Sequence, residues 1–155
     1  MQWNDLLPFL QVKASGGNGN PEITDVTCDS RSVGPGALYV GISGFKRHGD
    51  GFIDEAINKG AVAVMSENPQ PGRSVPWAQV GNTRKMLGTA GRLVWGIDLS
   101  TMLFIGITGT NGKTTTAYLF QRLFSEVFGP LSTWMFGTVA YSLGGTLLPA
   151  QRTTP

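Results

Sequence analysis

Apolar runs separated by polar, glycine- and proline-containing segments divide the N-terminal part of the chain into alternating strand and helix patterns. Residues 37–42 form a continuous apolar run, typical of a strand that is buried on both faces. Residues 52–59 carry apolar side chains at helical spacing, and Gly60 supplies a common helix-ending residue. Asn82 is a suitable N-cap for a further helix. The pattern predicts helices at 5–12, 52–59 and 83–95, strands at 23–28, 37–42, 61–65 and 75–80, and loops at 14–21 and 68–74.

A second pattern begins after a short link near residue 97. Residues 102–107 are strongly apolar and predict a strand, and a glycine-containing loop follows. An amphipathic helix is predicted at 113–128, because Pro130 cannot continue it. The side chains expected to face inward from this helix are Tyr118, Leu119, Leu123 and Val127, and further strands are expected at 132–136 and 139–143.

Alternation of strands and helices indicates an α/β fold. We expect a small α/β domain at 1–97 and the beginning of a second domain at 98–155. A strand, a loop, one helix and a strand or two do not close a hydrophobic core. The second domain is therefore expected to be the first part of a larger one.

Composition and charge exclude several classes of protein. The chain has 22 glycines in 155 residues, which indicates many tight turns and close backbone approaches. Its net charge of +2 is too small for an electrostatic nucleic-acid or membrane-surface partner. No apolar run is long enough to span a membrane, and the N-terminus lacks the positive start of a signal peptide. The single cysteine excludes an internal disulfide, so we expect a cytoplasmic protein.

The loop between the predicted strand at 102–107 and the predicted helix at 113–128 has the residues of a nucleotide-phosphate site. Glycines let backbone N–H groups converge, and the helix N-terminus adds partial positive charge. Lys113 is the candidate catalytic residue because it can neutralise the β- and γ-phosphates of ATP, and Thr114 is the candidate Mg²⁺ ligand. The alternative is a glycine-rich turn with a surface lysine. The candidate ATP-binding residues are Gly109, Thr110, Asn111, Gly112, Lys113, Thr114 and Thr115.

The loop departs from the general P-loop spacing because Ile107 stands where a glycine is required. The string from Gly106 to Thr116 instead resembles the ATP loop of the Mur ligases, the cytoplasmic enzymes of peptidoglycan precursor synthesis. A second block, from Asp29 to Val40, resembles their N-terminal domain, as does the stretch at 44–64 that follows. The resemblance is strongest to the MurE type, because of the triple threonine of the loop, Gly137-Thr138 and the final Thr-Thr-Pro; the MurF type is the alternative.

The resemblance implies that the N-terminal domain holds the UDP part of a UDP-sugar substrate and that the second domain is a P-loop-type ATP-binding domain. For Arg31, an Asx turn with a structural ion pair is favoured over ligand contact. For the basic loop at 46–48, a solvated surface loop is as good an interpretation as diphosphate contact, and for 153–154 the alternative is a turn before proline. The implied UDP-sugar-binding residues are Cys28, Ser30, Phe45, Lys46, Arg47, Arg152, Thr153 and Thr154.

The implied activity is ATP- and Mg²⁺-dependent formation of an amide bond between UDP-MurNAc-L-Ala-D-Glu and an amino acid, through an acyl phosphate. The implied partners are these small molecules, without nucleic acid or membrane insertion. We expect the 155 residues alone to be inactive, because no counterpart of the family's modified lysine or amino-acid-binding domain is found in them. The alternative from another class is a UDP-sugar or nucleotide-binding module that performs no chemistry.

Overall fold

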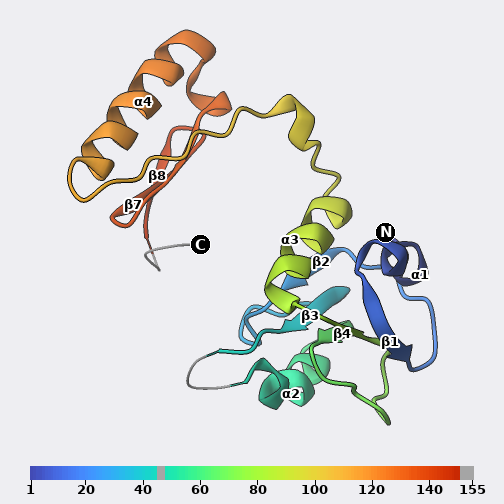
Figure 1. Ribbon diagram of the computed structural model, residues 1–155. Helices are drawn as coiled ribbons and strands as arrows, with labels where there is room; N and C mark the ends of the chain where they lie inside the picture. Colours follow the sequence, from blue (N-terminus) through green and yellow to red (C-terminus); the bar gives the residue numbers. More distant parts are fainter. Residues whose placement is uncertain (45–47, 151–155) are drawn as a thin grey trace. The chain divides into compact units, whose positions relative to one another are not determined.

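The computed structural model describes residues 1–44 and 48–150 and divides into two compact units, Met1–Met102 and Leu103–Pro155. The first unit is a sheet with helices on both faces, and the second is one long helix beside a small antiparallel sheet (Figure 1). The predicted α/β class is confirmed. The predicted ligand-binding domains, 1–97 and 98–155, stay a prediction, because compactness does not test what each domain binds.

A five-stranded sheet in the order β1-β5-β4-β3-β2 forms the centre of the first unit. β2 to β5 run parallel to their neighbours, whereas β1 pairs antiparallel with β5. The carboxyl ends of the four parallel strands therefore meet at one edge of the sheet. The strands are β1 (Val12–Gly16), β2 (Asp25–Thr27), β3 (Ala37–Gly41), β4 (Ala61–Ser66) and β5 (Trp77–Val80).

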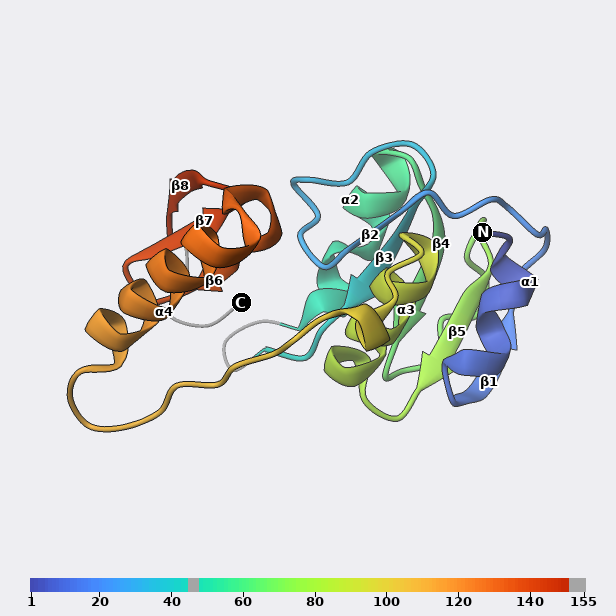
Figure 2. The same ribbon diagram turned by 90° about the horizontal axis from the view of Figure 1, so that it is seen from above.

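Helices cover both faces of this sheet, α2 on one side and α1 with α3 on the other (Figure 2). α3 begins where the Asn82 side chain accepts a hydrogen bond from the Lys85 amide at 2.9 Å, as its N-cap position predicts. The helical elements are α1 (Trp3–Leu6), η1 (Leu7–Phe9), η2 (Gly49–Phe52), α2 (Ile53–Asn58), α3 (Thr83–Val94) and η3 (Leu99–Thr101), where η denotes a 3₁₀-helix.

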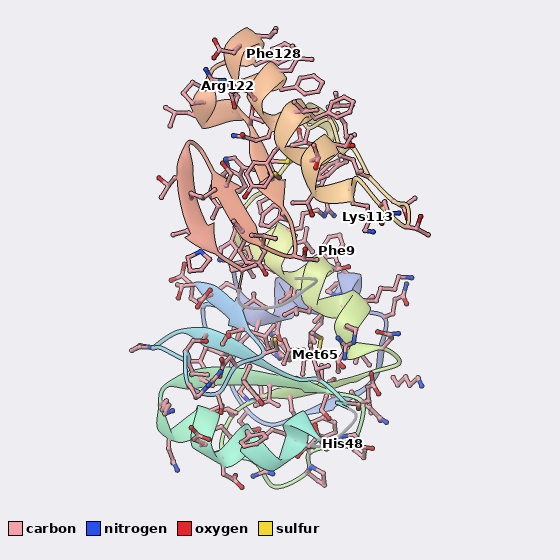
Figure 3. All side chains as sticks on the ribbon, turned by 90° about the vertical axis from the view of Figure 1, so that its left-hand side faces the viewer. Phe9, His48, Met65, Lys113, Arg122 and Phe128 are labelled. Atoms are coloured by element: carbon pink, nitrogen blue, oxygen red, sulfur yellow. The ribbon has the colours of Figure 1, made fainter. Side chains whose placement is uncertain are left out.

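The central strand β3 is buried along its whole length, as its apolar run predicts. Leu38 and Val40 pack into the cluster under α1 and α3, whereas Tyr39 points the other way and packs with Ile53 of α2. Met65 of β4 lies in the first of these clusters (Figure 3). Because side chains alternate along a strand, one short run supplies both cores of the unit.

The second unit places α4 against a three-stranded antiparallel sheet in the order β6-β7-β8. Gly144 and Gly145 join β7 to β8 with φ angles of 55° and 86°, which a two-residue type I′ hairpin requires. The Gln121 side chain of α4 donates to the hydroxyl of Ser142 at 3.1 Å. The elements are α4 (Lys113–Phe128), η4 (Pro130–Ser132), β6 (Trp134–Phe136), β7 (Ala140–Leu143) and β8 (Thr146–Pro149).

The predicted helix at 5–12 and loop at 14–21 are wrong in part. The helical segment ends at Phe9, Gln11 adopts a left-handed φ of 50°, and Val12 opens strand β1. β1 exists because it adds to the free edge of β5, a pairing that local sequence does not encode. Gly16 permits it, because a Cβ there would lie 2.9 Å from the ring of Trp77.

The strand predicted at 102–107 is not formed: among the described residues nothing pairs with it, and a strand needs a partner for its backbone hydrogen bonds. Leu103 and Phe104 are 79% and 68% exposed. Three of the α4 side chains expected to face inward, Leu119, Leu123 and Val127, are also exposed, because the small sheet packs against another side of the helix. The strand β8 was not predicted.

Candidate functional site

The glycine loop before α4 has the backbone geometry of an anion-binding turn. Gly109 and Gly112 adopt φ angles of 149° and 76°, which residues with side chains rarely do. Gly112 is the N-cap of α4, and no side chain caps this described helix start. The first amides of the helix are therefore left for another acceptor, and the 16-residue helix directs its positive end at the same place.

The Lys113 side chain folds back over this loop. Its Nζ donates to the carbonyl oxygens of Gly109 and, at 3.2 Å, of Thr110. Figure 3 shows Lys113 at one end of α4 and Phe128 at the other. Carbonyl oxygens hold the ammonium in position without neutralising its charge, so it stays available to a phosphate.

The loop residues fit a nucleotide phosphate and its metal. Thr110, Asn111, Thr114 and Thr115 are exposed, so their amides and hydroxyls can be reached. Thr114 occupies the second position of α4, where a hydroxyl can bind a Mg²⁺ ion that also contacts phosphate oxygens. Together with Lys113, the structure groups all the predicted ATP-binding residues on one turn.

The first unit offers a different kind of site, the carboxyl edge of its parallel strands. In open α/β sheets, ligands bind outside this edge. Cys28 and Ser30 follow β2, and Ser43 follows β3. Glu67 follows β4, and Thr83 opens α3 just after β5. We call these five residues, with Asp50 and Ser66, the substrate edge.

Asp29 and Arg31 form a closed local unit beside this edge. The Asp29 carboxylate accepts from the Arg31 backbone amide at 3.0 Å, which is an Asx turn, and from the Arg31 guanidinium at 2.9 and 2.6 Å. The hydrogen bonds and charge of Asp29 raise the pKa of Arg31. The structural interpretation of Arg31 therefore describes what the structure contains.

Ser30 is buried and its hydroxyl donates to the Glu55 carboxylate at 3.1 Å. Lys59 bridges the same pair, because its ammonium donates to the Ser30 carbonyl at 3.1 Å and to Glu55 at 2.7 Å. Hydrogen bonds from Lys59 and Ser30 lower the pKa of Glu55. Ser30 thus fixes the loop after β2 to α2, and Cys28, half-buried, packs against the core.

Sequence reasoning missed the polar side chains that hold the rest of the substrate edge. Asp50 accepts from the buried Ser66 hydroxyl at 2.6 Å and from Asn68 at 2.7 Å. Glu67 accepts from Thr83 and Ser43. The available signal was position, since a polar residue directly after an apolar parallel strand lies at the ligand-binding edge.

Six predicted UDP-sugar contacts lie outside the described residues and stay predictions. These residues are Phe45, Lys46, Arg47, Arg152, Thr153 and Thr154.

Both parts of the chain match protein-family models. The model described as Mur ligase family, catalytic domain, matches residues 22–95, and the model described as Mur ligase middle domain matches residues 107–155. The chain belongs to the Mur ligase family. The resemblance carried by the ATP loop and by the Asp29–Val40 block is confirmed.

Curated Mur ligases align with nearly the whole chain. The UDP-N-acetylmuramoyl-L-alanyl-D-glutamate--2,6-diaminopimelate ligase of Alkaliphilus metalliredigens (strain QYMF) is 36% identical over 156 residues, which cover 100% of this chain and 31% of that ligase. The ligase of the same name from Chlorobaculum tepidum is 40% identical over 159 residues, covering 99% of this chain and 31% of the relative. The chain thus spans 31% of the length of these relatives.

Solved Mur ligase structures share the fold. The MurF ligase from Thermotoga maritima in complex with ADP is 27% identical with a TM-score of 0.54, covering 66% of this chain and 23% of that one. A UDP-N-acetylmuramoyl-L-alanyl-D-glutamate--2,6-diaminopimelate ligase structure has a TM-score of 0.64 at 21% identity, covering 100% of this chain and 31% of that one. The curated relatives favour the MurE type, so the MurF alternative is not favoured.

Membrane insertion through a helix has no support in the described residues, where no helix is both long and apolar enough to cross a bilayer.

Proposed function

We propose that the chain is the UDP-sugar-binding and ATP-loop portion of a ligase that joins an amino acid to UDP-MurNAc-L-Ala-D-Glu. The single observation that supports this most is the combination of the Lys113 loop with the substrate edge in one chain that aligns almost end to end with 2,6-diaminopimelate ligases. Their names also support 2,6-diaminopimelate as the incoming amino acid.

The ATP side of the reaction falls to the loop at 109–115. The free amides of the first α4 turn bind phosphate oxygens, and the Lys113 ammonium offsets the charge of the group that is transferred. The Thr114 hydroxyl holds Mg²⁺ against the phosphates. ATP supplies the phosphoryl group that converts the substrate carboxylate into an acyl phosphate, and the amine of the amino acid then displaces phosphate. The ADP bound to the MurF relative supports a nucleotide at this loop.

The UDP end of the substrate falls to the substrate edge of the first unit. Serine hydroxyls there suit uracil or phosphate oxygens, and the predicted basic contacts Lys46 and Arg47 suit a diphosphate. Since the chain spans 31% of its relatives, the groups that bind the amino acid are proposed to lie in other parts of the ligase. The 155 residues alone are therefore expected to release no ADP. A cytoplasmic location follows from the nucleotide substrates.

An assay of ADP release by the protein that carries these residues tests the proposal. Release should require UDP-MurNAc-L-Ala-D-Glu and 2,6-diaminopimelate together. Release with UDP-MurNAc-tripeptide and D-alanyl-D-alanine instead would move the protein to the MurF reaction. Binding of UDP-MurNAc-dipeptide without ADP release under either condition would leave a binding module and refute the ligase.

A further inference from the structure

Glu67 joins three separate segments of the substrate edge through its carboxylate. Its Oε1 accepts from both the amide and the hydroxyl of Thr83, each at 3.0 Å. Its Oε2 accepts from the Ser43 hydroxyl at 3.1 Å. One side chain from the end of β4 therefore fixes the start of α3 and the end of β3 at the same time.

The backbone of Glu67 is held as firmly as its side chain. Gln79 of β5 donates from its side-chain amide to the Glu67 carbonyl at 3.0 Å. Thr83 is completely buried, so its hydroxyl has a fixed direction. The amide of Thr83 is the main cause that lowers the pKa of Glu67, and the positive end of α3 favours the same ionised form.

Ser43 transmits this anchoring to the far side of the loop after β3. Ser43 and His48 form an isolated antiparallel bridge, and the Ser43 hydroxyl lies 3.4 Å from Nδ1 of His48. Between these two residues, the sequence contains the predicted diphosphate contacts Lys46 and Arg47. The two described ends of that segment are thus set by Ser43, and Ser43 is set by Glu67.

We propose that Glu67 is a positioning residue for the UDP-sugar substrate, acting through Ser43 without touching the substrate. This rests on the proposed function, because it presumes that the substrate edge binds the UDP end. The carboxylate itself is occupied by internal donors on both oxygens, so it does not present an unsatisfied negative charge to a diphosphate. Its contribution is the placement of the neighbouring groups.

Steady-state kinetics of the full-length protein with Glu67→Ala tests this. We expect the KM for UDP-MurNAc-L-Ala-D-Glu to rise about tenfold, while kcat and the KM for ATP stay within about twofold, since a hydrogen bond to a charged group is lost only on the UDP side. Glu67→Gln should restore most of the affinity, because its amide can still accept from Thr83 and donate to Ser43. Ser43→Ala, which leaves the α3 contact intact, should raise the same KM about threefold.

Glu22→Ala is the matched control, because Glu22 is an exposed glutamate of the same unit whose only printed ion pair is a 3.9 Å contact with the N-terminal amine. It should change neither KM. An unchanged KM for the UDP substrate in both Glu67→Ala and Ser43→Ala would overturn the proposal, also if Glu67→Ala lowers the Tm, because that is what a purely structural role predicts. If Glu67→Ala does not fold, Ser43→Ala decides. A wild-type protein without dipeptide-dependent ADP release would refute the proposed function itself.

Discussion

Tyr39 links the central strand to the turn that begins η2, and replacing it with phenylalanine isolates one hydrogen bond. The side chain is 1% exposed, and its hydroxyl donates to the Gly49 carbonyl at 3.0 Å. The ring packs with Ile53 and Val64, and the substitution leaves these contacts in place. Tyr39→Phe therefore removes a donor without opening a cavity the size of a side chain.

At neutral pH we expect the free energy of unfolding to fall by about 1–2 kcal/mol. A buried acceptor that loses its partner costs about this much, and the retained ring keeps the apolar burial. The difference should depend on pH, because burial raises the pKa of Tyr39 from 10.0 to about 12. The stability contributed by the protonated hydroxyl is complete below pH 10, and it is lost as the pH rises through about 12, because the unfolded chain releases the proton first. Phenylalanine has no such loss, so the gap between the two proteins should close above pH 10.

Urea unfolding of both proteins from pH 7 to pH 12, followed by far-ultraviolet circular dichroism, measures this difference at each pH. Tyrosinate absorbance provides a second readout, because Tyr39 should titrate last and the variant should lack that final step. The reasoning would be refuted by equal stability at pH 7, or by a difference that stays constant across the alkaline range.

Three further substitutions test other parts of the structure. Lys113→Ala should reduce ligase turnover about a hundredfold or more while changing stability by no more than about 0.5 kcal/mol, whereas Arg122→Ala, an exposed cation on the same helix, should leave turnover unchanged. Gly49→Ala would put a Cβ 2.5 Å from a backbone nitrogen, so it should lower the Tm by several degrees more than Gly51→Ala, where nothing lies within 4 Å. Asn82→Ala should cost about 1 kcal/mol of unfolding free energy in urea, because the N-cap of α3 is lost; an unchanged midpoint would contradict that assignment.

Elements that depend on local signals were predictable from the sequence. The strand β3 follows from an uninterrupted apolar run, and α3 follows from Asn82 and a spaced apolar face. The ATP loop followed from its glycines and Lys113. In each case the determining residues lie within one segment, so no knowledge of the tertiary structure was needed.

Elements that depend on a distant partner were not predictable. β1 has a weakly apolar sequence and forms because β5 offers it an edge. The reverse holds at 102–107, where strong strand propensity has no partner among the described residues. The contacts of Glu67 with Ser43 and Thr83 join residues 24 and 16 positions apart. Propensity and spacing report what a segment favours, and the partner it meets is decided by the fold.

The antiparallel pairing of β1 with β5 has a consequence for how the first unit is made. Val12 pairs with Val80, so the first strand to leave the ribosome completes the sheet only after the last strand has emerged. The closure of this long loop adds to the entropic cost of folding and slows it. Until then, β5 has a free edge and α1 cannot reach its place over the core. The amino-terminal unit should therefore acquire its stability in a late, single step of synthesis, rather than strand by strand.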